Sequence, residues 1–136
     1  MTLKLFHTRG SCSLGIRILL EEIWLDYELA ELNFATADQR KPEYLALNPK
    51  GKVPALLRPD GTLLTEFPVI AQWLAENHPQ AKLLGESDAA RWRILETVEY
   101  VVSTLHMRGA TLFFRAERFA PTPEGQAFLK DMPAPW

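Results

Sequence analysis

The stretch "VPALLRPDGTLLTEFPVIAQWLAE", residues 53–76, predicts two strands followed directly by a helix. Pro59 and Gly61 in "RPDG" supply the backbone angles of a tight turn between the strands. Pro68 suits the first turn of a helix, because an N–H there has no intrahelical partner. Apolar residues then recur at helical spacing. The stretch therefore predicts a hairpin that leads into an amphipathic helix.

The chain before this stretch alternates strand and helix patterns. "LKLFH" (3–7) predicts a strand, and the apolar periodicity over about residues 12–24 predicts a helix. "DYELAELNF" (26–34) alternates apolar and polar residues as a half-buried strand does, and "PEYLAL" (42–47) suits a short helix. This order favours an α/β fold, with a mixed four-stranded sheet and helices on its faces.

The pattern changes after the polar linker at residues 78–88. Beyond this linker strand signals stop, and apolar residues recur every three or four positions, which predicts a long helix with Ser87 as its cap. We therefore expect a first domain over residues 1–80 and an all-helical segment over residues 81–136.

Composition excludes several classes of partner. The 136 residues are 47% hydrophobic and carry a net charge of −2, so no basic footprint for nucleic acid stands out. The N-terminus "MTLKLFHTRG" lacks the apolar core of a signal peptide, and no stretch approaches the roughly 20 apolar residues of a transmembrane helix. We expect no nucleic-acid and no membrane partner. The single cysteine favours a reducing, cytoplasmic setting.

That cysteine, Cys12, lies in "RGSCSL" (9–14), where a turn gives way to a helix. Open amide groups and the helix dipole at such a position favour an anion, and Ser11 and Ser13 could add hydrogen bonds to the sulfur. About 2 kcal/mol in favour of the thiolate would leave roughly half of the thiol ionised at pH 7. Cys12 is therefore either a reactive thiol or a small, half-buried helix residue.

Two further features suit a bound peptide. Pro54 begins a strand, where its missing N–H is tolerated, and a cis Val53–Pro54 bond would turn the Val53 backbone groups toward an added strand. Glu66 and Phe67 stand at a helix start, where amides could hold a carboxylate and Glu66 an ammonium. The alternatives are an edge proline that blocks aggregation and an acidic residue that stabilises a helix N-terminus.

"RGSCSL", "YLALNPKGKVPALL" and "DGTLLTEFPVIAQWLAE", in this order and spacing, resemble segments of the glutathione transferase superfamily, most of all its bacterial beta class. The resemblance covers a thioredoxin-like domain over residues 1–80 and the beginning of an incomplete helical domain after it. It implies a cytoplasmic detoxification enzyme that conjugates the thiolate of glutathione, its co-substrate, to small hydrophobic electrophiles. It also implies a homodimer and no metal.

The resemblance implies a role for each matched residue. Cys12 would lie beside the glutathione sulfur and form a mixed disulfide with it. Val53, ahead of the family's cis-proline at Pro54, would pair with the cysteinyl part of glutathione. Glu66 and Phe67 would hold its γ-glutamyl head.

A histidine follows in the helical segment. "STLHMRGATLFF" resembles the family helix in which a histidine faces the active site, so the resemblance implies that His106 lies near the electrophile or the sulfur. A lone histidine on a long helix is otherwise a surface or packing residue, and this alternative stays open.

Three departures from the family's pattern bear on function. Phe67 replaces the usual serine or glycine, so a hydroxyl contact to the glutathione carboxylate is lost and the ring could narrow the pocket. The chain stops at residue 136, short of the family's usual length, and we expect a fragment, a natural short form or cover from neighbouring chains. The lysine expected after the second strand falls near Thr36, and three nearby residues could replace it: Gln39, Arg40 and Lys41.

Two other functions compete with conjugation. Gly15 stands where a C-x-x-C motif would place its second cysteine, so a glutathione-dependent oxidoreductase would use a monothiol cycle. A non-catalytic, glutathione-transferase-like interaction module is favoured by Phe67 and by the short chain.

Overall fold

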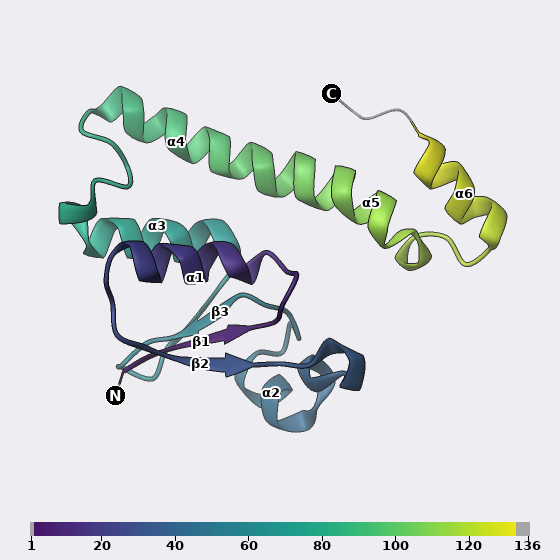
Figure 1. Ribbon diagram of the computed structural model, residues 1–136, viewed down its shortest axis with the longest axis horizontal. Helices are drawn as coiled ribbons and strands as arrows, with labels where there is room; N and C mark the ends of the chain where they lie inside the picture. Colours follow the sequence, from purple (N-terminus) through teal and green to yellow (C-terminus); the bar gives the residue numbers. More distant parts are fainter. Residues whose placement is uncertain (1, 133–136) are drawn as a thin grey trace. The chain divides into compact units, whose positions relative to one another are not determined.

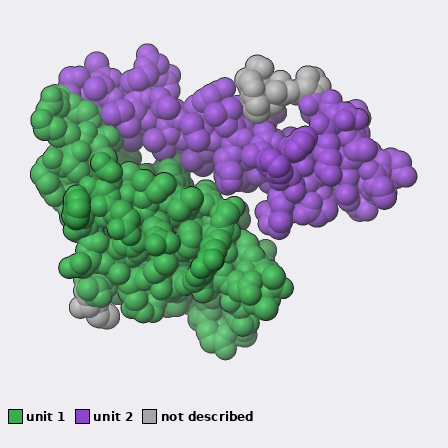
Figure 2. Space-filling model, in the orientation of Figure 1, with its two compact units in different colours: residues 1–86 green, residues 87–136 purple. Residues whose placement is uncertain are grey.

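The computed structural model describes residues 2–132. The chain forms two compact units, residues 1–86 and residues 87–136 (Figure 2). Among the described residues, no helix combines the length and apolar character needed to cross a membrane.

A four-stranded mixed sheet forms the centre of the first unit, in the order β2-β1-β3-β4. Strand β1 (Leu3–His7) pairs in parallel with β2 (Tyr27–Glu31). Strand β3 (Ala55–Leu57) runs antiparallel to β1 and to β4 (Leu63–Thr65). The predicted mixed sheet is confirmed, and the "RPDG" turn joins β3 to β4 as expected.

Helices cover both faces of this sheet (Figure 1). Helix α1 (Ser13–Glu22) is the crossover that parallel strands β1 and β2 require, and it packs beside α3 (Phe67–Asn77). Helix α2 (Pro42–Leu47) lies against the opposite face, where Tyr44 packs on Phe6. The main core between α1, α3 and the sheet is fully buried and aliphatic: Leu5, Ile16, Leu20, Leu56, Ile70 and Leu74.

Strand β2 ends before the predicted limit of residue 34. The Asn33 side chain accepts a hydrogen bond from the Ala35 N–H at 2.9 Å and caps a 3₁₀ turn, η1 (Phe34–Thr36). The Asn33 N–H donates to Asp38, the first residue of a second such turn, η2 (Asp38–Arg40). These local side-chain bonds compete with strand pairing, so the chain leaves the sheet early.

The regular elements of the second unit are all helices among its described residues. Helix α4 (Asp88–Tyr100) begins at Ser87, whose hydroxyl oxygen accepts from the Ala90 N–H at 3.2 Å, so the predicted cap is confirmed. The helix continues as a π-helical stretch, η4 (Val101–Ala110), which a pattern of 3.6-residue period does not predict. Three short helices follow: α5 (Thr111–Phe114), η5 (Ala116–Arg118) and α6 (Pro123–Asp131).

Candidate functional site

The structure brings Cys12 and Val53 together at one end of the sheet. Cys12 occupies the N-cap position of α1, and its thiol donates to the carbonyl oxygen of Val53 with a sulfur–oxygen distance of 3.7 Å. The Val53–Pro54 peptide bond is cis, and Pro54 is buried. Within residues 2–132, no group accepts from the Val53 N–H. A half-buried thiol therefore adjoins a stretch of backbone that retains a free donor.

A buried hydrogen-bond network holds the turn that carries Cys12. The Ser13 hydroxyl, which is inaccessible to solvent, lies 2.8 Å from His7 Nδ1 and 2.6 Å from the Ser11 hydroxyl. Ser11 also donates to the carbonyl oxygen of Thr8. The two serines expected to bond the sulfur are thus engaged within the turn. They fix the backbone at Cys12 instead.

Burial raises the pKa of the Cys12 thiol above its ordinary value, and the negative charge of Glu66 raises it further. The amide groups of Cys12 and Ser13 act in the opposite direction and lower it. Loss of hydration outweighs these amides at the head of α1. The expectation of a lowered pKa is therefore wrong for the unliganded chain, because sequence position does not reveal how deeply the sulfur is buried.

This raised pKa predicts slow alkylation of Cys12 at neutral pH. Only the thiolate reacts with iodoacetamide, so the midpoint of the rate–pH profile should lie above that of an unstructured peptide with blocked termini and a single cysteine, measured in parallel. Glu66→Gln removes a nearby negative charge and should lower the midpoint, whereas Glu22→Gln, at the other end of α1, should not move it. A midpoint at or below that of the blocked peptide would contradict the prediction.

The turn ahead of Val53 is braced by two buried side chains that the sequence analysis missed. The Tyr44 hydroxyl donates to the carbonyl oxygen of Lys52 at 2.6 Å, and the Asn48 amide donates to the same oxygen at 2.9 Å. Tyr44 is 5% exposed and Asn48 is 2% exposed. The spacing of four residues between Tyr44 and Asn48 was the one signal in the sequence that their side chains could act together.

Glu66 lies next to this turn in an unusual conformation and with a partner. Its φ of 70° is rarely adopted by residues other than glycine, and it is the N-cap residue of α3. Its carboxylate oxygen is 2.6 Å from Lys50 Nζ, which also donates to the Thr65 hydroxyl at 2.8 Å. Lys50 is thus a third residue that the sequence analysis missed, because its partners lie 15 and 16 positions away.

The ring of Phe67 packs toward the core. It lies against Gly15 of α1, where an added Cβ would stand only 2.7 Å from the ring atom Cε2. The absence of a side chain at Gly15 accommodates the bulky ring at a position where the family pattern has serine or glycine. The expected loss of a hydroxyl at position 67 remains, while the Phe67 amide keeps its place at the start of α3.

The loop candidates near Thr36 differ in their contacts. Lys41 forms an ion pair with Asp38 at 2.6 Å. Together with hydrogen bonds from the Asn33 N–H and the Thr36 hydroxyl, this ion pair lowers the pKa of Asp38 to about 2. Arg40 instead approaches the Lys50 turn, with Nη1 3.2 Å from the point where a Cβ on Gly51 would stand.

His106 belongs to the second unit. It lies half-buried in η4, and its carbonyl oxygen accepts from the Thr111 hydroxyl at 2.8 Å. Its expected place near the electrophile or the sulfur stays a prediction.

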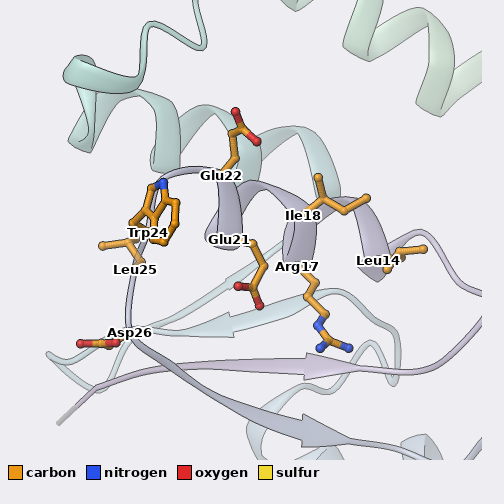
Figure 3. Close-up of a pocket in the computed structure, with 8 residues that line it drawn as sticks. All are labelled: Leu14, Arg17, Ile18, Glu21, Glu22, Trp24, Leu25 and Asp26. Atoms are coloured by element: carbon orange, nitrogen blue, oxygen red, sulfur yellow. The ribbon is translucent and has the colours of Figure 1, made fainter.

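A separate hollow lies along the outer face of α1 (Figure 3). The side chains of Arg17 and Glu21 point to the same side of α1. Trp24 and Leu25 line the hollow beyond the C-terminal end of this helix. None of the predicted glutathione-site residues lines it. The hollow is therefore distinct from the Cys12–Val53 site.

Comparisons with known proteins agree with this geometry. The family model for the glutathione S-transferase N-terminal domain matches residues 10–77. The chain is 39% identical over 129 residues to glutathione S-transferase GstA of Escherichia coli O157:H7, covering 91% of this chain and 64% of that relative. A glutathione transferase homologue from Sulfitobacter, solved with bound glutathione, is similar with a TM-score of 0.87 and 35% identity, covering 95% of this chain and 62% of that one.

The bacterial beta class glutathione S-transferase of Sphingomonas chungbukensis is also similar, with a TM-score of 0.74, 29% identity, and coverage of 93% of this chain and 64% of that one. The mixed sheet, with a cysteine at the head of α1 beside a cis-proline, defines a thioredoxin-like domain. The chain belongs to the glutathione S-transferase family. It spans between 62% and 64% of the length of these three relatives.

Proposed function

We propose that the first unit binds glutathione and that the chain acts as a glutathione transferase. The observation that carries the proposal is the contact between Cys12 Sγ and the carbonyl oxygen of Val53, beside a free Val53 N–H. A similar structure holds glutathione, which supports this choice of ligand.

Each part of glutathione has a partner in this proposal. The cysteinyl backbone pairs with the N–H and C=O groups of Val53, as an added strand would. The ammonium of the γ-glutamyl head meets the Glu66 carboxylate, and its carboxylate meets the Phe67 amide. Arg40 is the best placed of the three loop candidates for the glycyl carboxylate, because Lys41 is paired with Asp38.

The proposed reaction joins the glutathione thiolate to a small hydrophobic electrophile: a carbon–sulfur bond forms, and with an aryl halide the carbon–halogen bond breaks and halide leaves. Binding orients the tripeptide, and the amide groups of Cys12 and Ser13, which lower the pKa of the Cys12 thiol, would stabilise the glutathione thiolate in the same way. His106 and other residues of the helical unit would receive the electrophile. The remaining elements of the proposal are a cytoplasmic homodimer and detoxification as its role.

Calorimetric titration of glutathione into the folded chain tests the proposal. We expect saturable binding, weakened about tenfold or more by Glu66→Ala, because a hydrogen bond to a charged group contributes about 1.5–3 kcal/mol. The matched control Glu22→Ala changes an exposed carboxylate outside the site and should leave the affinity unchanged. No binding at millimolar glutathione would instead support the non-catalytic interaction module.

Thiol–disulfide exchange is a second candidate function. The lone half-buried Cys12, with Gly15 three residues later, suits a monothiol cycle. Turnover of a mixed-disulfide substrate and of an aryl halide, measured on the same preparation, separates exchange from conjugation. Conjugation predicts turnover of the aryl halide.

A further inference from the structure

We propose that Lys50 is a specificity-determining residue that binds the α-carboxylate of the γ-glutamyl head, while Glu66 binds its α-ammonium. This inference rests on the proposed glutathione site and adds a residue to it. The ligand class it names is a γ-glutamyl thiol whose head carries both charges.

The contacts of Lys50 carry the proposal. Its Nζ lies 2.6 Å from Glu66 Oε1 and 2.8 Å from Thr65 Oγ1, so a cation, an anion and a hydroxyl are gathered where β4 meets α3. The side chains of Lys50 and Glu66 are 51% and 57% exposed, so both charges remain open to a ligand.

The backbone of Lys50 is fixed, although its side chain is exposed. The Lys50 N–H donates to Asn48 Oδ1 at 3.2 Å, and the Gly51 N–H donates to the Asn48 carbonyl at 2.9 Å. Asn48 is itself buried and bonded to Lys52. The Lys50 side chain therefore extends from a turn that hydrogen bonds hold in place. Lys50 lies three residues before Val53, the residue proposed to bind the cysteinyl part of the same ligand.

Charge matching explains why a zwitterionic head suits this pair. An α-amino-acid head carries its ammonium and carboxylate on one carbon, and the Lys50–Glu66 pair presents the complementary charges at hydrogen-bond distance from each other. An exposed ion pair contributes little to stability, so exchanging it for two contacts with the ligand costs little. A ligand with only one of the two charges would leave Lys50 or Glu66 unmatched.

The competing interpretation is that Lys50 only neutralises Glu66. Lys50 would then compete with the ligand's ammonium, and its removal would strengthen binding of every ligand that carries this ammonium. The two interpretations predict opposite effects on glutathione affinity, so a single substitution separates them.

The test is calorimetry with glutathione and with 4-aminobutyryl-cysteinyl-glycine, which keeps the ammonium but lacks the α-carboxylate. We expect Lys50→Met to weaken glutathione binding about tenfold and to leave binding of the analogue unchanged or tighter. Lys52→Met, a matched change at an exposed lysine of the same turn, should alter neither affinity. Equal thermal unfolding midpoints for the three proteins confirm that the turn is intact.

Three outcomes overturn the role of Lys50 alone, provided that the unmodified chain binds glutathione. They are unchanged glutathione affinity in Lys50→Met, tighter glutathione binding, and an equal loss for glutathione and the analogue. If the unmodified chain binds neither ligand, the proposed function fails and this inference fails with it.

Discussion

Replacing Cys12 with alanine is expected to abolish mixed-disulfide formation with glutathione disulfide, and to leave glutathione affinity within about tenfold, or 1.4 kcal/mol. In the proposed reaction of the unmodified chain, the Cys12 thiolate would attack one sulfur of glutathione disulfide. The Cys12–glutathione bond forms, the original disulfide breaks, and one glutathione thiolate leaves. Binding should persist in the variant, because the contacts proposed for the tripeptide come from Val53, Glu66 and the Phe67 amide.

Intact-mass measurement after incubation with glutathione disulfide, followed by calorimetry with reduced glutathione, checks both parts. Cys12→Ser is the matched control, because its hydroxyl can keep a donor beside the Val53 carbonyl without redox chemistry. An unmodified chain that forms no adduct would remove the exchange role. A loss of affinity far beyond tenfold in both variants would make Cys12 a binding residue, in contradiction of the prediction.

The rate of this exchange should rise with pH, because the pKa of the half-buried Cys12 thiol is raised. Burial and the Glu66 charge raise the pKa of Cys12, so the thiolate fraction is small near neutrality and grows as pH rises. Bound glutathione would place an ammonium near Glu66 and offset part of its charge. The raised pKa therefore applies to the Cys12 thiol before glutathione binds.

Local signals explain why the hairpin and α3 were predictable. Pro59 and Pro68 fix their own φ angles, and Gly61 adopts the positive φ of 82° that the turn needs, so "RPDGTLLTEFP" specifies its turn and helix start without help from the rest of the chain. The end of β2 was not predictable from alternation, because the Asn33 and Asp38 side chains bond backbone groups that a longer strand would have used.

The candidate site shows the same division between local and distant causes. The position of Cys12 at a helix start followed from the sequence, but its raised pKa depends on burial and on Glu66, which is remote in sequence. Lys50 and Asn48 lie in "NPKGK", and their contacts become visible only once β4 and the cis Val53–Pro54 segment are placed beside them. The roles of these residues depend on contacts between segments that are far apart in the sequence, and the spacing of apolar residues does not reveal such contacts.

The second prediction with a large effect is a strong coupling between Phe67 and Gly15 in the free energy of unfolding. In the unmodified chain, Gly15→Ala is expected to destabilise the fold by about 1–2 kcal/mol. The added methyl group would stand 2.7 Å from the Phe67 ring, and relief of this overlap would disturb a ring that packs on the core. The overlap outweighs the gain of about 1 kcal/mol that alanine brings to a helix interior over glycine.

The same substitution made together with Phe67→Ser should have the opposite sign. Without the ring the methyl group meets no overlap, so the helix propensity gain remains and Gly15→Ala should stabilise by about 1 kcal/mol. Urea unfolding of the unmodified chain, both single variants and the double variant gives the coupling free energy, expected at about 2–3 kcal/mol. An equal effect of Gly15→Ala in both backgrounds would show that Gly15 does not accommodate Phe67. The expected sign reversal would show that the absence of a side chain at Gly15 is what lets the Phe67 ring pack on the core.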